Sequence, residues 1–143
     1  MTKIEFYILE DSQPKAVYKL AVELIRNAYN NNQRVFIHTH TQKEAEKLDE
    51  LLWTQDPSSF LPHLLANEGA GILPPIQIGF GQEPAVRPDL LVNLSQEVPP
   101  FHGQFAKIIE FAHGDEETKQ KARERFKYYR ERGYPLQHYN RHS

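Results

Sequence analysis

The sequence contains no cysteine and no long apolar run. Without cysteine there is no disulfide and no thiolate metal site, so a zinc finger is excluded, and the commonest soft nucleophile is missing too. No apolar stretch approaches the roughly 18 residues that a membrane span needs. The first residues, MTKIEFYILED, enter a strand-like pattern instead of a charged-then-apolar signal. We therefore expect a cytoplasmic protein.

Motifs for catalysis are also scarce. His38 and His40, which are separated by one residue at a predicted strand end, are the best metal candidates, but no carboxylate or third histidine stands at a ligand spacing beside them. The Gly-x-Gly pairs at 69–71 and 79–81 lack the continuation of a phosphate-binding loop, and no GxSxG motif occurs. We predict no catalytic residue, metal or cofactor. A nucleotide-using or metal enzyme remains the minority alternative.

What the sequence does contain is positive charge near its end. The 143 residues are 39% hydrophobic and 25% charged, which fits one soluble domain with a continuous core. Residues 1–114 hold 9 Lys and Arg against 14 Asp and Glu, whereas residues 115–143 hold 8 against 5. A protein that grips duplex DNA is usually basic overall. An anionic protein segment is therefore at least as good a candidate partner.

Hydrophobic periodicity predicts alternating strands and helices. This order favours an α/β fold with a mostly parallel central sheet flanked by helices, which is Rossmann-like. A single domain is expected over residues 1–134, with a flexible C-terminal tail over 135–143. The predicted strands are 4–9, 34–38, 76–80, 89–95 and 107–112. The first predicted helix begins at residue 16 and stops in the three asparagines 30–32, and the other predicted helices are 41–53 and 115–132. The proline-rich segment 54–75 is predicted to be a long loop.

The last predicted helix carries two neighbouring stripes. Ala122, Phe126 and Tyr129 share the side suited to packing on a sheet. A line of bases lies beside them: Lys119, Arg123, Lys127 and Arg130. An ordinary solvated face, partly neutralised by residues such as Glu124, is the alternative interpretation. Four bases beside aromatic edges can also clamp a carboxylate and an apolar ring together.

A second unusual patch surrounds the only tryptophan. Trp53 ends a predicted helix where the proline-rich segment begins, and Phe60 and Pro62 lie within that segment. Core packing is the simpler interpretation. The composition is nevertheless typical of a protein–protein hot spot.

Four segments of the chain resemble a known family. They are FYILED, KEAEKLDELLWTQDPSSFLPHLLANEG, PDLLVNLS and KQKARERFKYYRERGY, in that order. Together they are similar to the chi subunit of bacterial DNA polymerase III holoenzyme, an accessory protein of the clamp-loader complex in DNA replication. The resemblance implies a single α/β domain without catalytic activity. Such subunits bridge the small psi subunit and the acidic C-terminal tail of single-stranded DNA-binding protein, which ends in an Asp-Phe-Pro-Phe-like sequence.

Carried over by position, the resemblance implies two surfaces. The psi-binding surface would include Trp53, Phe60 and Pro62. The tail-binding surface would include Lys119, Arg123, Phe126, Lys127 and Arg130. Phe126 departs from the tyrosine of a family member, so the ring is kept and the hydroxyl is lost. DNA would be reached only indirectly, and direct binding of single-stranded nucleic acid by the basic helix is the alternative.

Overall fold

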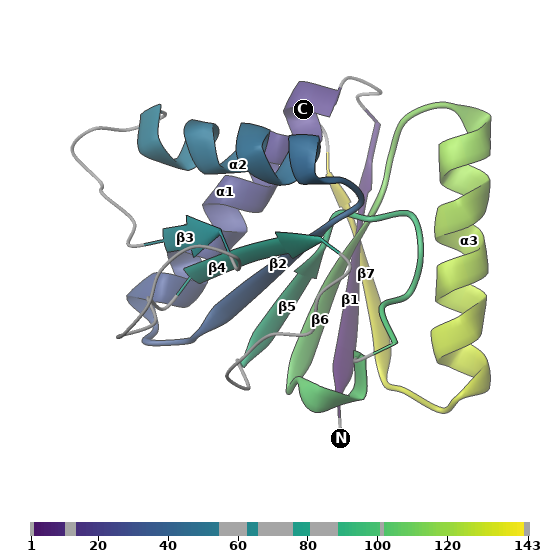
Figure 1. Cartoon of the computed structure of the whole chain (residues 1–143). Coiled ribbons are helices and arrows are strands. Elements are labelled where there is room, and N and C mark those ends of the chain that lie inside the picture. Colours follow the sequence, from purple (N-terminus) through teal and green to yellow (C-terminus); the bar gives the residue numbers. More distant parts are fainter. Residues whose placement is uncertain are drawn as a thin grey trace.

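A parallel β-sheet forms the centre of the computed structural model, which describes residues 2–10, 14–54, 63–65, 76–80, 89–100 and 102–141 (Figure 1). Within these residues seven strands lie in the order β3-β4-β2-β5-β6-β1-β7, and every neighbouring pair is parallel. The strands are β1 (Lys3–Leu9), β2 (Val35–Thr39), β3 (His63–Leu65), β4 (Ile76–Phe80), β5 (Leu90–Asn93), β6 (Lys107–Ala112) and β7 (Leu136–Arg141).

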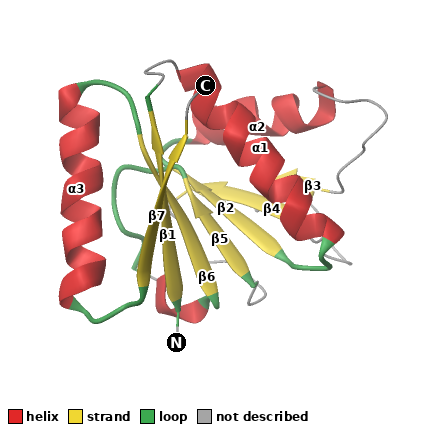
Figure 2. Cartoon of the chain, turned by 180° about the vertical axis from the view of Figure 1, so that it is seen from behind, coloured by secondary structure: helices red, strands yellow, loops and turns green. Residues whose placement is uncertain are grey.

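Three α-helices in the described residues cover the two faces of this sheet. They are α1 (Pro14–Asn30), α2 (Gln42–Thr54) and α3 (Glu116–Glu131), and a short 3₁₀ helix, η1, spans His102–Gln104. Seen from behind, α1 crosses the sheet while α3 stands beside β1 and β7 (Figure 2). None of the helices in the described residues combines the length and apolar character that would let it cross a membrane.

One face of the sheet packs against α1 and α2. Ile25 of α1 and Leu48 of α2 are fully buried in the same cluster as Ile37 of β2. The predicted apolar face of α1 supplies most of the helical contacts, because its residues recur every three or four positions. Burial of each large aliphatic side chain of this kind contributes about 1.5–3 kcal/mol.

The opposite face packs against α3. Phe36 lies between Val35 and Ile37 in β2 but belongs to the other cluster, because alternate strand residues point to opposite faces. Phe6 of β1 and Tyr129 of α3 are buried with it. The middle strands are therefore buried on both sides, as expected for a parallel sheet.

The predicted fold class is confirmed, since the sheet is parallel and helices lie on both faces. Local sequence patterns also predicted the positions of several elements correctly. The segment KIIEFA forms β6 over the predicted residues 107–112. At the start of α2, the backbone N–H of Glu44 donates to Oγ1 of Thr41 over 3.2 Å, so Thr41 caps the helix that was predicted to begin there. At the end of α3, Gly133 has the positive φ of 79° that favours glycine there.

Two elements differ from the sequence-based prediction. Residues 136–141 do not form a tail but form the edge strand β7, in which Leu136 pairs with Ile4 of β1. The segment predicted as a long loop contains β3, whose three residues pair with β4. Both strands are defined by their pairing with another strand, β7 with β1 and β3 with β4. Neither has the apolar alternation that marks a strand locally.

Candidate functional site

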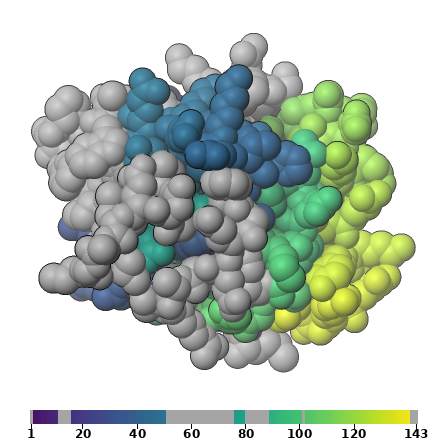
Figure 3. Space-filling model, viewed as in Figure 1, coloured from purple at the N-terminus to yellow at the C-terminus, as the bar shows by residue number. Residues whose placement is uncertain are grey.

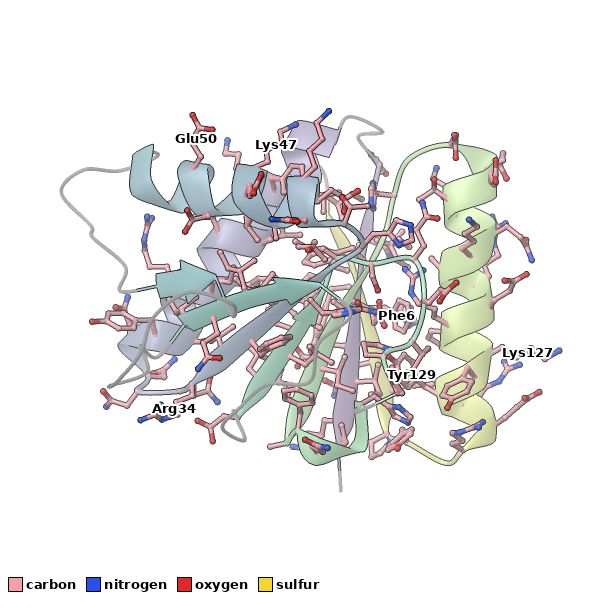
Figure 4. All side chains as sticks on the ribbon, viewed as in Figure 1. Phe6, Arg34, Lys47, Glu50, Lys127 and Tyr129 are labelled. Atoms are coloured by element: carbon pink, nitrogen blue, oxygen red, sulfur yellow. The ribbon has the colours of Figure 1, made fainter. Side chains whose placement is uncertain are left out.

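The predicted basic stripe lies on the outer side of α3. Arg123, Lys127 and Arg130 are exposed, and Lys119 is half-buried. Figure 4 shows Lys127 projecting away from the body of the molecule. Residues of α3 and β7 form one continuous flank in the space-filling view (Figure 3). The structure thus brings four of the predicted site residues to one helix surface.

Ion pairs within the helix compensate this stripe only weakly. Nη1 of Arg123 lies 3.9 Å from a carboxylate oxygen of Glu116, and Nζ of Lys127 lies 4.0 Å from one of Glu131. All four side chains are more than half exposed, so solvent screens these attractions. Arg123 also donates to Oε1 of Gln120 over 3.2 Å. The bases can therefore exchange these contacts for an anionic partner at small free-energy cost.

Phe126 lies between the stripe and the core. Its ring packs edge-on against Phe6 of β1, with the centroids 5.2 Å apart, and the residue is only half-buried. Of the apolar stripe that the sequence predicted, Ala122 and Tyr129 are buried. One ring edge is therefore held by the core while part of Phe126 remains accessible beside the bases.

A buried polar network beneath α3 was missed by the sequence prediction. Glu110 of β6 is completely buried, and Nε of Arg125 donates to its Oε1 over 2.9 Å. The hydroxyl of Tyr129 donates to Oε2 over 2.7 Å, and Nδ2 of Asn93 donates to the same oxygen over 2.8 Å. A buried carboxylate needs such partners, because its desolvation is otherwise very costly.

This network fixes how α3 is oriented on the sheet. Arg125 and Tyr129 lie one helical turn apart and both bind Glu110, so rotation of the helix would break two hydrogen bonds to a buried group. Burial raises the pKa of Glu110, while Arg125 and the donors from Asn93 and Tyr129 act in the opposite direction. Burial and the nearby Glu110 carboxylate also raise the pKa of Tyr129, so its hydroxyl keeps its proton. The basic stripe consequently points outward.

The sequence did hold one signal for this network. Glu110 is the only acidic residue within the otherwise mostly apolar strand KIIEFA. Arg125 stands three positions after Ala122 and four before Tyr129, which places it on the buried side of the helix. An acid in a buried strand and a base on a buried helix face together indicate an ion pair.

The two histidines considered for a metal have different surroundings. His38 is buried, and its Nδ1 lies 3.2 Å from Oδ1 of Asn93 and 3.1 Å from Oγ of Ser95. Burial lowers the pKa of His38. His40 is exposed, and its backbone N–H donates to Glu44. In the described part of the chain, no group of three His, Asp or Glu side chains could hold a metal ion.

The second predicted surface is only partly visible in the structure. Trp53 lies in the last turn of α2, on the helix that covers the face opposite α3. Phe60 and Pro62 lie outside the described residues. The relative placement of these three side chains therefore stays a prediction.

Comparisons with known proteins agree with one another over nearly the whole chain. The model of the family described as "DNA polymerase III chi subunit, HolC" matches residues 1–137. A DNA polymerase III subunit chi from Pseudomonas aeruginosa is 35% identical over 137 residues, 96% of this chain and 95% of that relative. The Haemophilus influenzae subunit chi is 37% identical over 133 residues, 92% of each chain. The Escherichia coli subunit chi is 33% identical over 141 residues, 95% of this chain and 96% of that relative.

Proposed function

The chain belongs to the family of DNA polymerase III chi subunits, and from this premise we propose that it is a non-catalytic accessory subunit acting in the bacterial cytoplasm. It would bridge the psi subunit of the clamp-loader complex and the acidic C-terminal tail of single-stranded DNA-binding protein. The exposed bases of α3 beside the half-buried Phe126 carry this proposal. DNA is then reached through the protein that coats it.

The chemistry of the acidic tail suits this surface of α3. Aspartates and a terminal carboxylate need bases, which Lys119, Arg123, Lys127 and Arg130 supply along one side of the helix. A terminal phenylalanine needs an apolar contact, which Phe126 offers at the edge of the core. A flexible peptide loses entropy when it binds, so single-tail affinity should be modest. Several tails on one partner would raise the effective affinity.

Charge reversal at the centre of the stripe tests the tail surface. Arg123→Glu is expected to weaken binding of a peptide ending in Asp-Phe-Pro-Phe by roughly tenfold or more, because charge-assisted hydrogen bonds contribute about 1.5–3 kcal/mol. Fluorescence anisotropy of the labelled peptide measures the change. Lys43→Glu is the matched control, since Lys43 is an exposed base on α2, on the other side of the sheet.

Two outcomes would contradict the tail proposal. Equal loss of affinity in both variants would mean that net charge, not the α3 stripe, decides binding. If bare single-stranded DNA bound as tightly as the peptide at physiological salt, the basic helix would instead be a nucleic-acid-binding surface.

A second substitution tests the psi-binding surface. Trp53→Ala is expected to abolish complex formation with psi in a size-exclusion or pull-down assay, because buried tryptophans dominate many interfaces. Tail-peptide binding should stay unchanged, since α2 and α3 lie on opposite faces of the sheet. Circular dichroism is the fold control. If Trp53→Ala unfolds the domain, the ring is part of the core and the surface assignment fails.

A further inference from the structure

The outer side of β7 is an edge of the sheet that no strand pairs with in the described part of the chain. β7 comes last in the strand order, next to β1. Figure 2 shows it on the side of the sheet where α3 stands. Its residues LQHYNR include no proline or lysine, and they pair with β1 one by one without a bulge. Prolines, lysines and bulges are common devices that prevent an edge from pairing, so this edge is open to a further strand.

The backbone groups of alternate β7 residues point away from β1. The N–H of Ile4 donates to the carbonyl oxygen of Pro135 over 2.9 Å, although Ile4 lies opposite Leu136. In a parallel ladder, a residue bonds to the residues before and after its opposite partner, so Ile4 bonds to Pro135 and Gln137. The same alternation continues along the strand. The residues that turn both N–H and C=O outward are therefore Leu136, His138 and Asn140.

These outward groups are accessible. His138 and Asn140 are exposed, and Leu136 is half-buried. A row of evenly spaced, solvated N–H and C=O groups is the template to which an extended peptide adds as a strand. The main-chain hydrogen bonds of such a complex need no particular side chain on the peptide, so charge and apolar contacts have to select the partner.

Helix α3 places its bases on the side of this edge. Nε of Arg125 donates to Glu110 of β6, whereas the ring of the next residue, Phe126, packs against Phe6 of β1. Because β1 lies between β6 and β7, the Phe126 side of α3 is the side nearer to β7. Positions seven and three before Phe126 and four after it share that side of the helix. They hold bases: Lys119, Arg123 and Arg130.

An apolar contact connects this side of α3 with β7. Leu136 and Phe126 pack against the same core cluster, on the α3 face of the sheet. His138 and Asn140 point to that face as well, because alternate strand residues share a face. A strand added beyond β7 would also direct every second side chain to the α3 face. Carboxylates at those positions would lie on the same side as the bases.

Charge favours an acidic peptide over a second copy of the chain. Two β7 edges could pair antiparallel about His138, because the three outward residues are evenly spaced. Directly opposite residues of an antiparallel pair share a face, so this register would place both α3 helices on one face of the joined sheet. The bases of the two helices would then face each other, and like charges across an interface are unfavourable.

We infer that the outer edge of β7 binds an extended acidic peptide segment as an additional strand, with every second side chain of the segment facing α3. The inference rests on the proposed function, since the segment is the part of the acidic tail that precedes Asp-Phe-Pro-Phe. The terminal residues of the tail contact Phe126 and the bases of α3. The preceding residues pair with the backbone of Leu136, His138 and Asn140.

A scan with N-methylated peptides tests the strand pairing. The probe is an acidic peptide of roughly ten residues that ends in Asp-Phe-Pro-Phe, long enough for one strand of ordinary length. Each preceding residue in turn carries a methyl group on its backbone nitrogen. Successive N–H groups of an added strand point alternately to β7 and to solvent, so anisotropy should show a loss of about fivefold at every second position and none between. Losses at every position, or at none, overturn the inference.

A matched pair of variants tests the same contact from the protein side. His138→Pro removes one outward N–H without removing a bond to β1, and proline is tolerated on an edge strand in that orientation. His138→Ala keeps the N–H and accounts for the loss of the ring. The proline variant should bind the long peptide about fivefold more weakly than the alanine variant. Equal affinities in the two folded variants contradict the inference, and the peptide scan carries the test if the proline variant does not fold.

The short peptide Asp-Phe-Pro-Phe separates this inference from the proposed function. It should bind both His138 variants equally, because its contacts lie on α3. If the short peptide binds but the long peptide shows no alternation, the edge pairing is wrong and the proposed function stands. If neither peptide binds, the proposed function fails. Sedimentation of the chain alone should show a monomer, and a dimer that the long peptide dissociates would assign the edge to a second copy instead.

Discussion

At the scale of single residues, Glu110 of β6 joins side chains of β5 and α3 in one hydrogen-bond network. Its carboxylate is completely buried, and three side chains from β5 and α3 donate to it. His38 joins the same network through Asn93. A buried hydrogen-bond network of this kind makes the interface between helix and sheet rigid when every polar group in it has a hydrogen-bond partner.

Removing one donor to this carboxylate should destabilise the domain. Tyr129→Phe is expected to lower the free energy of unfolding by about 1.5–3 kcal/mol, because a hydrogen bond to a buried charged group is lost. Urea denaturation measures the effect as a lower midpoint with an unchanged slope.

Tyr139→Phe is the matched control for that substitution. The hydroxyl of Tyr139 donates to Gln137 over 2.8 Å at an exposed position, so its loss should change stability by less than about 0.5 kcal/mol. If both variants behave alike, Arg125 and Asn93 alone satisfy Glu110 and the hydroxyl of Tyr129 is dispensable.

At the scale of elements, helix caps were the most predictable features. The first turn of α2 is closed by Thr41, whose Oγ1 accepts from the backbone N–H of Glu44 over 3.2 Å. That contact follows from residue types three positions apart, and it needs no tertiary information. Local contacts of this kind can be predicted from the sequence because both partners lie in one short segment.

Removal of the α2 cap should therefore have a measurable and specific effect. Thr41→Ala is expected to lower the free energy of unfolding by about 1 kcal/mol, whereas Thr41→Ser keeps the oxygen and should stay close to the parent protein. Thermal denaturation followed by circular dichroism compares the two. Equal losses would assign the effect to the lost methyl group instead of the hydrogen bond.

Elements that depend on distant partners were the least predictable. Strand β7 reads LQHYNR, and most of its residues are exposed, since it lies at the sheet edge. Such a strand shows no alternation of apolar and polar residues, and only pairing with β1 defines it. The basic stripe needed only helical spacing, but the role of Arg125 needed the position of Glu110 on another element.

At the scale of the whole molecule, charge is divided between two regions. Residues 115–143 hold 8 Lys and Arg against 5 Asp and Glu, and they include α3 and β7, which form one flank (Figure 3). Helix α2, with Trp53, lies on the other face of the sheet. The proposed tail-binding surface on α3 and the helix α2 therefore lie on different faces of the sheet.

This division predicts different responses to salt. Tail-peptide binding should weaken several-fold when NaCl rises from about 0.05 M to about 0.5 M, because ions screen exposed charges within a few ångströms at high salt. Binding of psi, which we propose to depend on apolar residues, should change much less. Anisotropy and size-exclusion measurements at matched salt compare the two, and a salt-independent peptide affinity would contradict the role of the stripe.

The position of β1 in the sheet has a consequence for synthesis of the protein. Ile4 pairs with Ile108 of β6 on one side and with Leu136 of β7 on the other. A ribosome makes β1 well before β6 and β7, because both neighbours lie far later in the sequence. Contacts so distant in sequence also slow folding, because the chain between them has to be ordered first. The apolar segment IEFYIL is therefore expected to stay unpaired on the nascent chain, where a chaperone would protect it until α3 and β7 have emerged.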